Sequence, residues 1–143
     1  MDDFDRDGSA GYLANHMARL FARHLHAGIR PLGLSLGAFP ALLHLWEKDG
    51  LTQKELVERL HIEQPTMANT LARMERDGLV RRAKDSADAR IQRIWLTDKG
   101  RAMQAEAIHA ALTVNARALA GLSEAEQAQF LDLMRRVILT LNR

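Results

Sequence analysis

Residues 61–97 read HIEQPTMANTLARMERDGLVRRAKDSADARIQRIWLT, and this stretch decides the fold. Its first half has apolar residues at helical spacing, with Pro65 at the first helical position, where its missing N–H is not needed. Gly78 supplies the C-terminal cap of this helix, which runs to about Asp77. Two strand-like arms, 79–84 and 91–96, then flank the charged tip DSADAR. A helix with a small, polar outer face beside a basic hairpin is typical of proteins that lay a helix in a DNA groove.

A second short helix directly precedes this stretch. The run Thr52-Gln53-Lys54-Glu55 forms a capping box, in which the Thr52 side chain bonds forward to the backbone and Glu55 reaches back. The helix that it opens ends near residue 60, so only a few residues separate it from the helix that begins at Pro65. Two short helices joined by so tight a turn predict a helix-turn-helix.

The rest of the chain also reads as helices. Apolar spacing predicts helices over 12–29 and 36–48, the second with Pro40 in its first turn. After the hairpin, Thr97 can cap a long helix that runs through residue 119, and Ser123 opens a final helix with a second capping box. The predicted fold class is therefore mainly α: a winged helix-turn-helix with a small β-hairpin wing and long N- and C-terminal helices.

These terminal helices carry more apolar surface than the central module can cover. The residues that need a partner are Leu112, Leu119, Phe130, Leu131, Met134, Ile138 and Leu141. A second copy of the chain is the best candidate for that partner. We therefore expect a homodimer in which residues 11–34 and 98–143 form the dimerisation helices, and residues 35–97 form the DNA-binding lobe.

Composition and charge agree with a helical protein that binds a polyanion. Hydrophobic residues make up 47% of the 143 residues and aromatic residues only 5%. The net charge of +2 is small, but residues 73–93 carry seven basic and four acidic side chains, whereas residues 1–9 carry four aspartates and one arginine. The sequence has no cysteine, no signal peptide and no apolar stretch long enough to cross a bilayer. We expect a cytoplasmic protein with no membrane partner.

Taken in order, these elements resemble the MarR family of winged helix-turn-helix transcription regulators, most closely its SlyA-like branch. The resemblance spans nearly the whole chain and is sharpest in IEQPTMANTLARMERDGLVRR, DSADAR and IWLTDKG. Wings of that family often read Asp-Arg-Arg at the tip, whereas here Ala89 takes the middle position and leaves the Asp88-x-Arg90 pair. The resemblance implies a single MarR-like domain (1–143) that regulates transcription, more often as a repressor, by binding a pseudo-palindromic, A·T-rich operator as a homodimer.

The helix that starts at Pro65 has two different faces. Met67, Leu71 and Met74 share one face and are expected in the core. The opposite face could be ordinary solvated surface, but inside a helix-turn-helix it suits base reading, because Asn and Gln grip adenine and Thr or Pro touches a thymine methyl. The candidates for base edges are Gln64, Pro65, Thr66 and Asn69. Thr70 and Arg73 lie nearer the flanks, where phosphate is the expected target.

The wing supplies the remaining DNA candidates. The resemblance implies that Arg90 enters the minor groove, where A·T runs concentrate negative potential. Asp88 would then orient Arg90 through a charge-assisted hydrogen bond, although an exposed Asp–Arg pair with no further role is the alternative. Further candidates for phosphate are Gln53, Arg81, Arg82, Lys84 and Arg93. Some of these arginines could instead pair with Asp85 or Glu75.

The family resemblance also implies a small, often aromatic or phenolic, anionic effector, bound between the dimerisation helices and the DNA-binding lobe. On position in the fold alone, six residues could line that cleft: His16, Leu20, His24, Phe39, Leu43 and Trp46. Core packing or ordinary surface is the stronger interpretation of each of these residues.

Metal binding and catalysis find little support in the sequence. The six histidines include no HxxxH or HExxH spacing, and neither a glycine-rich phosphate loop nor a recognisable catalytic triad is present. We therefore expect no metal, no cofactor and no enzyme activity. Three alternatives to a specific regulator stay open: a winged-helix module for protein contacts, a low-specificity DNA-architectural protein, and a metal sensor.

Overall fold

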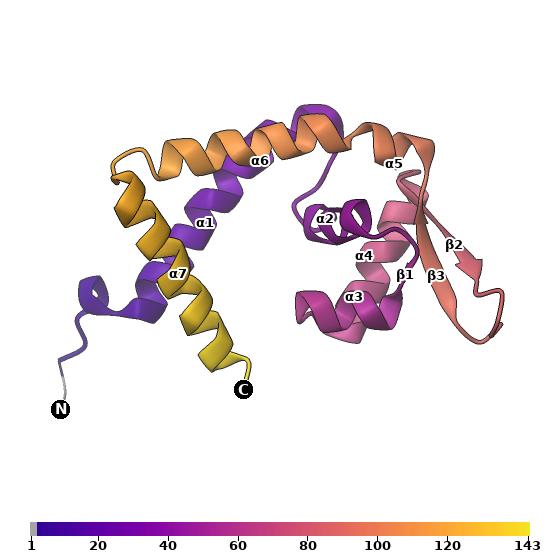
Figure 1. Ribbon diagram of the computed structural model, residues 1–143, viewed down its shortest axis with the longest axis horizontal. Helices are drawn as coiled ribbons and strands as arrows, with labels where there is room; N and C mark the ends of the chain where they lie inside the picture. Colours follow the sequence, from indigo (N-terminus) through magenta and orange to yellow (C-terminus); the bar gives the residue numbers. More distant parts are fainter. Residues whose placement is uncertain (1–2) are drawn as a thin grey trace.

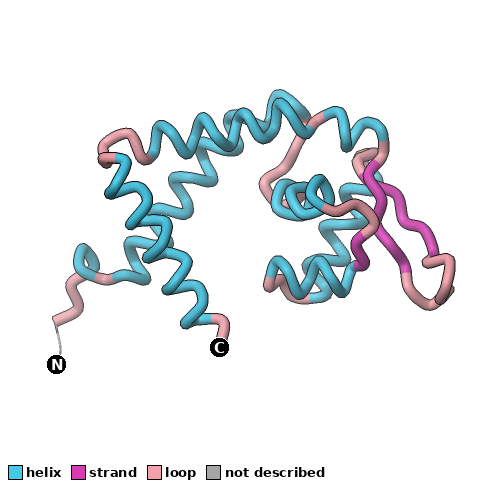
Figure 2. The backbone as a smooth tube through the Cα atoms, viewed as in Figure 1, coloured by secondary structure: helices cyan, strands magenta, loops and turns pink. Residues whose placement is uncertain are grey.

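The computed structural model of this chain describes residues 3–143. Its elements, in chain order, are the 3-10 helix η1 (Arg6–Gly8), α1 (Ala10–Ile29), the 3-10 helix η2 (Arg30–Leu32), α2 (Phe39–Glu47), β1 (Leu51–Thr52), α3 (Gln53–Leu60), α4 (Gln64–Arg76), β2 (Val80–Lys84), β3 (Gln92–Leu96), α5 (Asp98–Ala102), α6 (Gln104–Ala118) and α7 (Glu124–Leu141). Figure 2 shows a mainly helical chain with one small sheet, which confirms the predicted fold class.

The elements form two groups (Figure 1). The central lobe, residues 35–97, contains α2, α3, α4 and the three strands. The helical arm consists of α1, α6 and α7: α6 runs away from the lobe beside α1, and α7 folds back from its far end. The β2–β3 hairpin, residues 80–96, is the wing and projects from the lobe on the side opposite the arm.

The hydrophobic core lies in the central lobe. Side chains from α2, α3, α4 and the sheet pack together there, among them Leu42, Leu45, Leu56, Met67, Leu71, Met74 and Ile94. Ile29 and Ala107 join the same core and so attach the lobe-facing ends of α1 and α6. Within residues 3–143, α7 contributes no buried side chain. The arm is therefore held to the lobe at one end, and several of its apolar side chains, among them Leu112, Val137 and Leu141, are exposed within the described residues.

Both predicted capping boxes are present. Thr52 Oγ1 accepts the backbone N–H of Glu55 at 3.0 Å, and Glu55 Oε1 accepts the backbone N–H of Thr52 at 3.1 Å. Ser123 and Glu126 form the same pair of bonds at the start of α7. The helix-turn-helix is also confirmed, with one shift: α4 begins at Gln64, so that Pro65 lies second in the helix rather than first. Proline is tolerated at both positions because neither N–H has a partner within the helix.

The wing forms as predicted, but the sheet has a third strand. Val80 pairs with Leu96 and Lys84 with Gln92 in the antiparallel hairpin. The two residues of β1 pair with the other edge of β3, Leu51 opposite Ile94 and Thr52 opposite Arg93. Two residues are too few to show the alternation of a strand, and Thr52 also caps α3. Strand β1 thus joins the wing directly to the start of the helix-turn-helix.

The single long helix expected from Thr97 to residue 119 is a wrong prediction, because it is divided into α5 and α6 at Met103. Trp46 Nε1 donates a hydrogen bond at 3.0 Å to the carbonyl of Gly100, which is the carbonyl that would accept the N–H of Gln104 in a continuous helix. Arg101 also binds Asp49 at 3.1 Å. These two contacts attach α5 to the lobe, so the change of direction at Met103 lies where the lobe ends and the arm begins.

Candidate nucleic-acid interface

The two faces of α4 are separated as expected. Met67, Leu71 and Met74 are at most 1% exposed and pack in the lobe core. The residues predicted to read bases, Gln64, Pro65, Thr66 and Asn69, are all exposed, as is Arg73, whereas Thr70 is half-buried. The N-terminal half of α4 therefore presents amide, hydroxyl and apolar groups at the surface, which are the groups that match base edges in a major groove.

Gln53, predicted as a phosphate contact, lies beside one of these base-reading candidates. Gln53 is the first residue of α3 and Gln64 the first residue of α4. The Nε2 of Gln53 donates a hydrogen bond to Oε1 of Gln64 at 3.0 Å. The pairing was not foreseen, because the two residues belong to different helices and only the turn between the helices brings them together.

The tip of the wing holds Arg90 in a fixed orientation. Its Nε and Nη2 each donate to a different oxygen of Asp88, both at 3.0 Å, and its backbone N–H also donates to Asp88 Oδ1. This bond is the main reason that the pKa of Asp88 is lowered and the pKa of Arg90 is raised. The Arg90 side chain is nevertheless 90% exposed. Asp88 thus orients a cation whose side chain stays exposed, through the charge-assisted bond that the resemblance implied.

Asp85 and Arg93 close the wing at its tip end, where β2 leads into the tip. Asp85 Oδ2 accepts the backbone N–H groups of Ala87 and Asp88, each at 3.0 Å, which shapes the tip. Its other oxygen accepts Arg93 Nε at 2.6 Å, and Arg93 Nη1 donates to the carbonyl of Gly50 at 2.9 Å. Arg93 was predicted as a phosphate contact. The structure places its guanidinium against three groups of the protein, since Glu55 also lies 3.8 Å away.

The other basic candidates divide into two kinds. Arg81 and Lys84 on β2 are exposed and available to a phosphate. Arg82 is half-buried, and its Nε lies 3.8 Å from Glu75 Oε1 on α4. Within the described chain, that Nε has no hydrogen-bond partner. Arg82 therefore packs between the wing and α4 rather than projecting from the wing.

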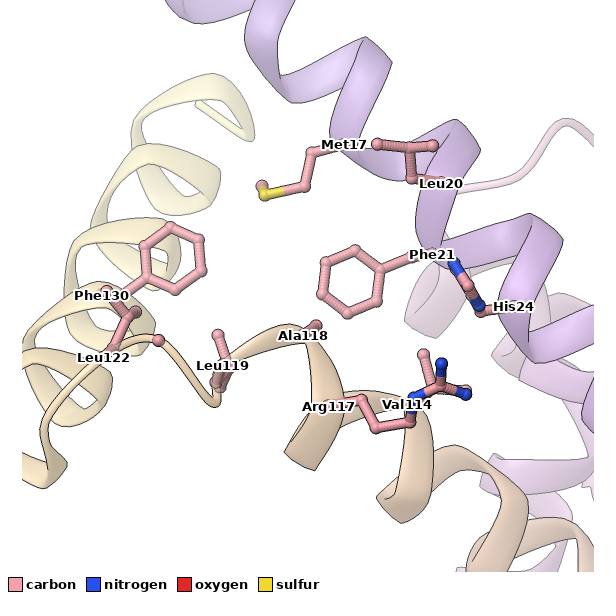
Figure 3. A pocket seen from close by; sticks show the side chains of 11 residues that line it. Met17, Leu20, Phe21, His24, Val114, Arg117, Ala118, Leu119, Leu122 and Phe130 are labelled. Carbon is pink, nitrogen blue, oxygen red and sulfur yellow. The ribbon is translucent and has the colours of Figure 1, made fainter.

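A cavity lies in the helical arm, between α1, the end of α6 and the start of α7 (Figure 3). Its volume is about 550 Å³, and its walls are mostly apolar. Figure 3 shows Phe21 and Phe130 pointing into it from α1 and α7, with His24 and Arg117 together at one side. It can therefore hold a small molecule with an apolar body and one negatively charged end.

This cavity differs in place from the effector cleft that the sequence suggested. Of the six residues expected there, Leu20 and His24 line it. Phe39 and Trp46 instead pack edge to face in the lobe, with ring centroids 6.2 Å apart, and Leu43 packs against the lobe core. His16 lies next to Tyr12 on α1. The residues that sequence reasoning missed, Phe21, Arg117 and Phe130, come together only through the fold of the arm.

Two other features are absent from the part of the chain that the structure describes. No three histidine, aspartate or glutamate side chains there lie close enough together to hold a metal ion. Residues 3–143 also contain no helix that is long and apolar enough to span a membrane.

Comparison with known proteins gives the same family from the sequence and from the fold. A MarR family model matches residues 32–91. The transcriptional regulator HosA of Escherichia coli O127:H6 is 34% identical over 127 residues, which cover 88% of this chain and 94% of HosA.

Solved structures of this family superpose on nearly all of the chain. The PcaV transcriptional regulator of Streptomyces coelicolor, solved with its natural ligand, has a TM-score of 0.84 at 27% identity and covers 96% of this chain and 97% of its own. A MarR-family transcriptional regulator of Listeria monocytogenes, solved with a 26-mer DNA, has a TM-score of 0.83 at 26% identity. The match covers 99% of this chain and 90% of the Listeria protein.

Proposed function

The chain belongs to the MarR family of transcriptional regulators, and we propose that it is a repressor that binds a pseudo-palindromic operator as a homodimer and is released by a small anionic effector. It is a DNA-binding regulator and not an enzyme. The finer parts of this proposal are the DNA contacts, the dimer and the effector, and each is supported by a different part of the molecule.

The geometry of α4 and the wing supports the DNA contacts best. The exposed residues at the start of α4 would enter the major groove, where Gln64 and Asn69 can each bond two atoms of an adenine and Pro65 and Thr66 can touch a thymine methyl. Arg90, held by Asp88 at the wing tip, would enter the adjacent minor groove. Thr70, Arg73, Arg81 and Lys84 would bind phosphates along the path between them.

In-vitro selection of bound duplexes from a random pool tests this proposal. We expect a palindrome whose half-sites lie about 34 Å apart, one turn of B-DNA, with A·T pairs where the wing meets the minor groove. If the DNA affinity depends on salt but the selection recovers no common sequence, the protein is an architectural one instead. Complete failure to retain duplex would favour a module for protein contacts.

The apolar surface of the arm supports the homodimer. Leu133, Val137 and Leu141 recur at every fourth residue of α7, and all three are more than 40% exposed. Leu112 on α6 and Leu13 on α1 add to this surface, at 60% and 48% exposed. Such a stripe is stable in water only when it is covered, and a second arm offers the matching surface. Sedimentation equilibrium of the full chain should give twice the monomer mass of 16.1 kDa.

The cavity in the arm supports the effector. A carboxylate placed between Arg117 and His24 would bond to both, while an aromatic body would pack against Phe21 and Phe130. Because the cavity joins α1 to α6 and α7, its occupation would favour one arrangement of the arm, and thus one spacing of the two lobes. Benzoate should therefore release operator DNA and raise the melting temperature, whereas benzyl alcohol, which has a similar body and no charge, should do neither.

An Arg117→Met variant should lose the response to benzoate and keep its affinity for the operator. If benzoate, and a series of larger aromatic acids, leave both melting temperature and DNA binding unchanged, the cavity belongs to dimer packing and the effector part of the proposal is wrong.

A further inference from the structure

Gln53 and Gln64 form a hydrogen-bonded amide pair at the point where the two helices of the helix-turn-helix begin. The bond runs from Gln53 Nε2 to Gln64 Oε1 and is 3.0 Å long. We propose that Gln53 is a positioning residue for base recognition: it fixes the amide of Gln64 in the orientation that reads adenine. This inference rests on the proposed function, since it requires the start of α4 to lie in the major groove.

The two glutamines differ in how firmly the protein holds them, and this difference indicates which one orients the other. Gln53 is half-buried at the first position of α3, next to the capping box of Thr52 and Glu55, which fixes the backbone there. Gln64 is exposed at the first position of α4. The better-fixed residue therefore orients the freer one, which is exposed at the surface.

The hydrogen-bonding groups that remain on Gln64 match adenine. Its Oε1 has two lone pairs, and the bond from Gln53 uses one of them. The other lone pair can accept the N6 amino group of adenine, while Nε2 donates to N7. An amide turned by half a revolution would present its donor and acceptor in the wrong order. As long as Gln53 Nε2 donates and Gln64 Oε1 accepts, the bond holds the Gln64 amide in one of these two orders before DNA arrives.

A glutamine side chain is otherwise among the more flexible in proteins, because it has three rotatable bonds. Ordering it on binding opposes association, and a neighbour that orders it in the free protein removes part of that opposition. Gln53 would act on the affinity for the matching base rather than on the affinity for DNA in general. This distinguishes it from a phosphate contact, which weakens or strengthens all sequences alike.

The experiment measures base preference in the full-length protein. Selection with the wild type and with Gln64→Met first identifies the base pair that Gln64 reads, as the position whose adenine preference is lost. Equilibrium binding then compares the selected operator with one in which that A·T pair is replaced by G·C in both half-sites. The proteins compared are the wild type, Gln53→Met, Gln64→Met and the double variant. Methionine keeps the length of the side chain and removes its amide.

We expect the wild type to prefer the A·T operator by about tenfold or more per half-site, the size of a bidentate base contact. Gln53→Met should lose most of this preference, and the double variant should lose no more than Gln64→Met alone. The melting temperature of Gln53→Met should equal that of the wild type. Gln104→Met, which changes an exposed glutamine at the first position of α6, serves as the matched control and should keep the full preference.

Two results would overturn the inference while leaving the proposed function intact. One is a Gln53→Met protein that binds both operators more weakly by the same factor and keeps the preference, because Gln53 would then contact phosphate. The other is a Gln64→Met protein that selects the same sequence as the wild type, because Gln64 would then read no base. A wild-type protein that selects no sequence at all would overturn the proposed function, and this inference with it.

Discussion

Arg93 Nε lies 2.6 Å from Asp85 Oδ1, so that an ion pair joins β3 to the residue that follows β2, at the tip end of the wing. The same Asp85 binds the backbone at the tip, and Arg93 also binds the carbonyl of Gly50, just before β1. Contacts therefore run without a break from Asp88, which orients Arg90, through Asp85 and Arg93 to the start of α3. The position of the minor-groove candidate depends on the position of the helix-turn-helix.

The first prediction concerns Arg93. An Arg93→Met variant should bind the operator more weakly, because the wing is no longer held against α3, but the log–log salt dependence of binding should be unchanged. A phosphate contact would instead lower that slope by about 0.9. We expect the free energy of unfolding to fall, because a half-exposed charged bond is lost and the Gly50 carbonyl loses its donor. Lys84→Met, on the same sheet, is the contrasting variant, and its salt slope should fall.

The second prediction concerns Arg90. Arg90→Ala should fold as the wild type does, because the side chain is 90% exposed, and should lose most of its specific affinity for the operator. Arg90→Lys should restore little of it, because an ammonium cannot form the two parallel bonds that Asp88 makes with the guanidinium. Arg6→Ala removes an equally basic side chain outside the lobe and should leave affinity unchanged. Equal operator affinity of wild type and Arg90→Ala, at matched salt, would contradict the assignment.

The third prediction follows from the pKa of Asp85, which the hydrogen bond from Arg93 and the two backbone N–H groups lower from its usual 3.8. Because the pKa is lower in the folded protein than in the unfolded one, the carboxylate stabilises the fold at all pH values well above 3.8. That contribution is lost as the pH falls through the folded-state pKa. Chemical denaturation from about pH 5 to about pH 2 should show a steeper loss of stability for the wild type than for Asp85→Asn.

The sequence predicted the local features of this fold well and the long-range ones poorly. The capping boxes at Thr52 and Ser123 and the buried face of α4 depend on residues within a few positions of one another, and all of these predictions are confirmed. The break at Met103 lies beside a contact from Trp46, which is far away in the sequence, and no helical pattern shows it. The bond of Arg93 to Gly50 needs the register of β1 against β3.

The candidate site follows the same division. The exposure of Gln64, Thr66 and Asn69 was predictable from helical periodicity alone, and the Asp88–Arg90 bond from a spacing of two residues. The Gln53–Gln64 pair requires the geometry of the turn between two helices, and the cavity beside Phe21 requires the angle at which α7 folds back. Neither quantity is encoded in a local pattern.

The last prediction tests the dimer through the apolar stripe of α7. Val137 lies in the middle of this stripe and is 57% exposed, and within the described residues α7 adds nothing to the buried core of its own chain. A Val137→Glu change should therefore leave the lobe folded. In a dimer it would place an unpaired carboxylate in an apolar interface on both sides of the two-fold axis, which we expect to raise the dimer dissociation constant about a hundredfold or more.

Ala128→Glu adds the same charge at an exposed position on the opposite face of the same helix, about two and a half turns from Val137, and serves as the control. Sedimentation at micromolar concentration should give a monomer for Val137→Glu and a dimer for Ala128→Glu. Operator affinity should fall with dimerisation, because a monomer contacts only one half-site and loses the gain from linking two lobes. If Val137→Glu remains dimeric at the same concentration as the wild type, α7 is not at the interface, and the apolar surfaces of α1 and α6 would have to form it without α7.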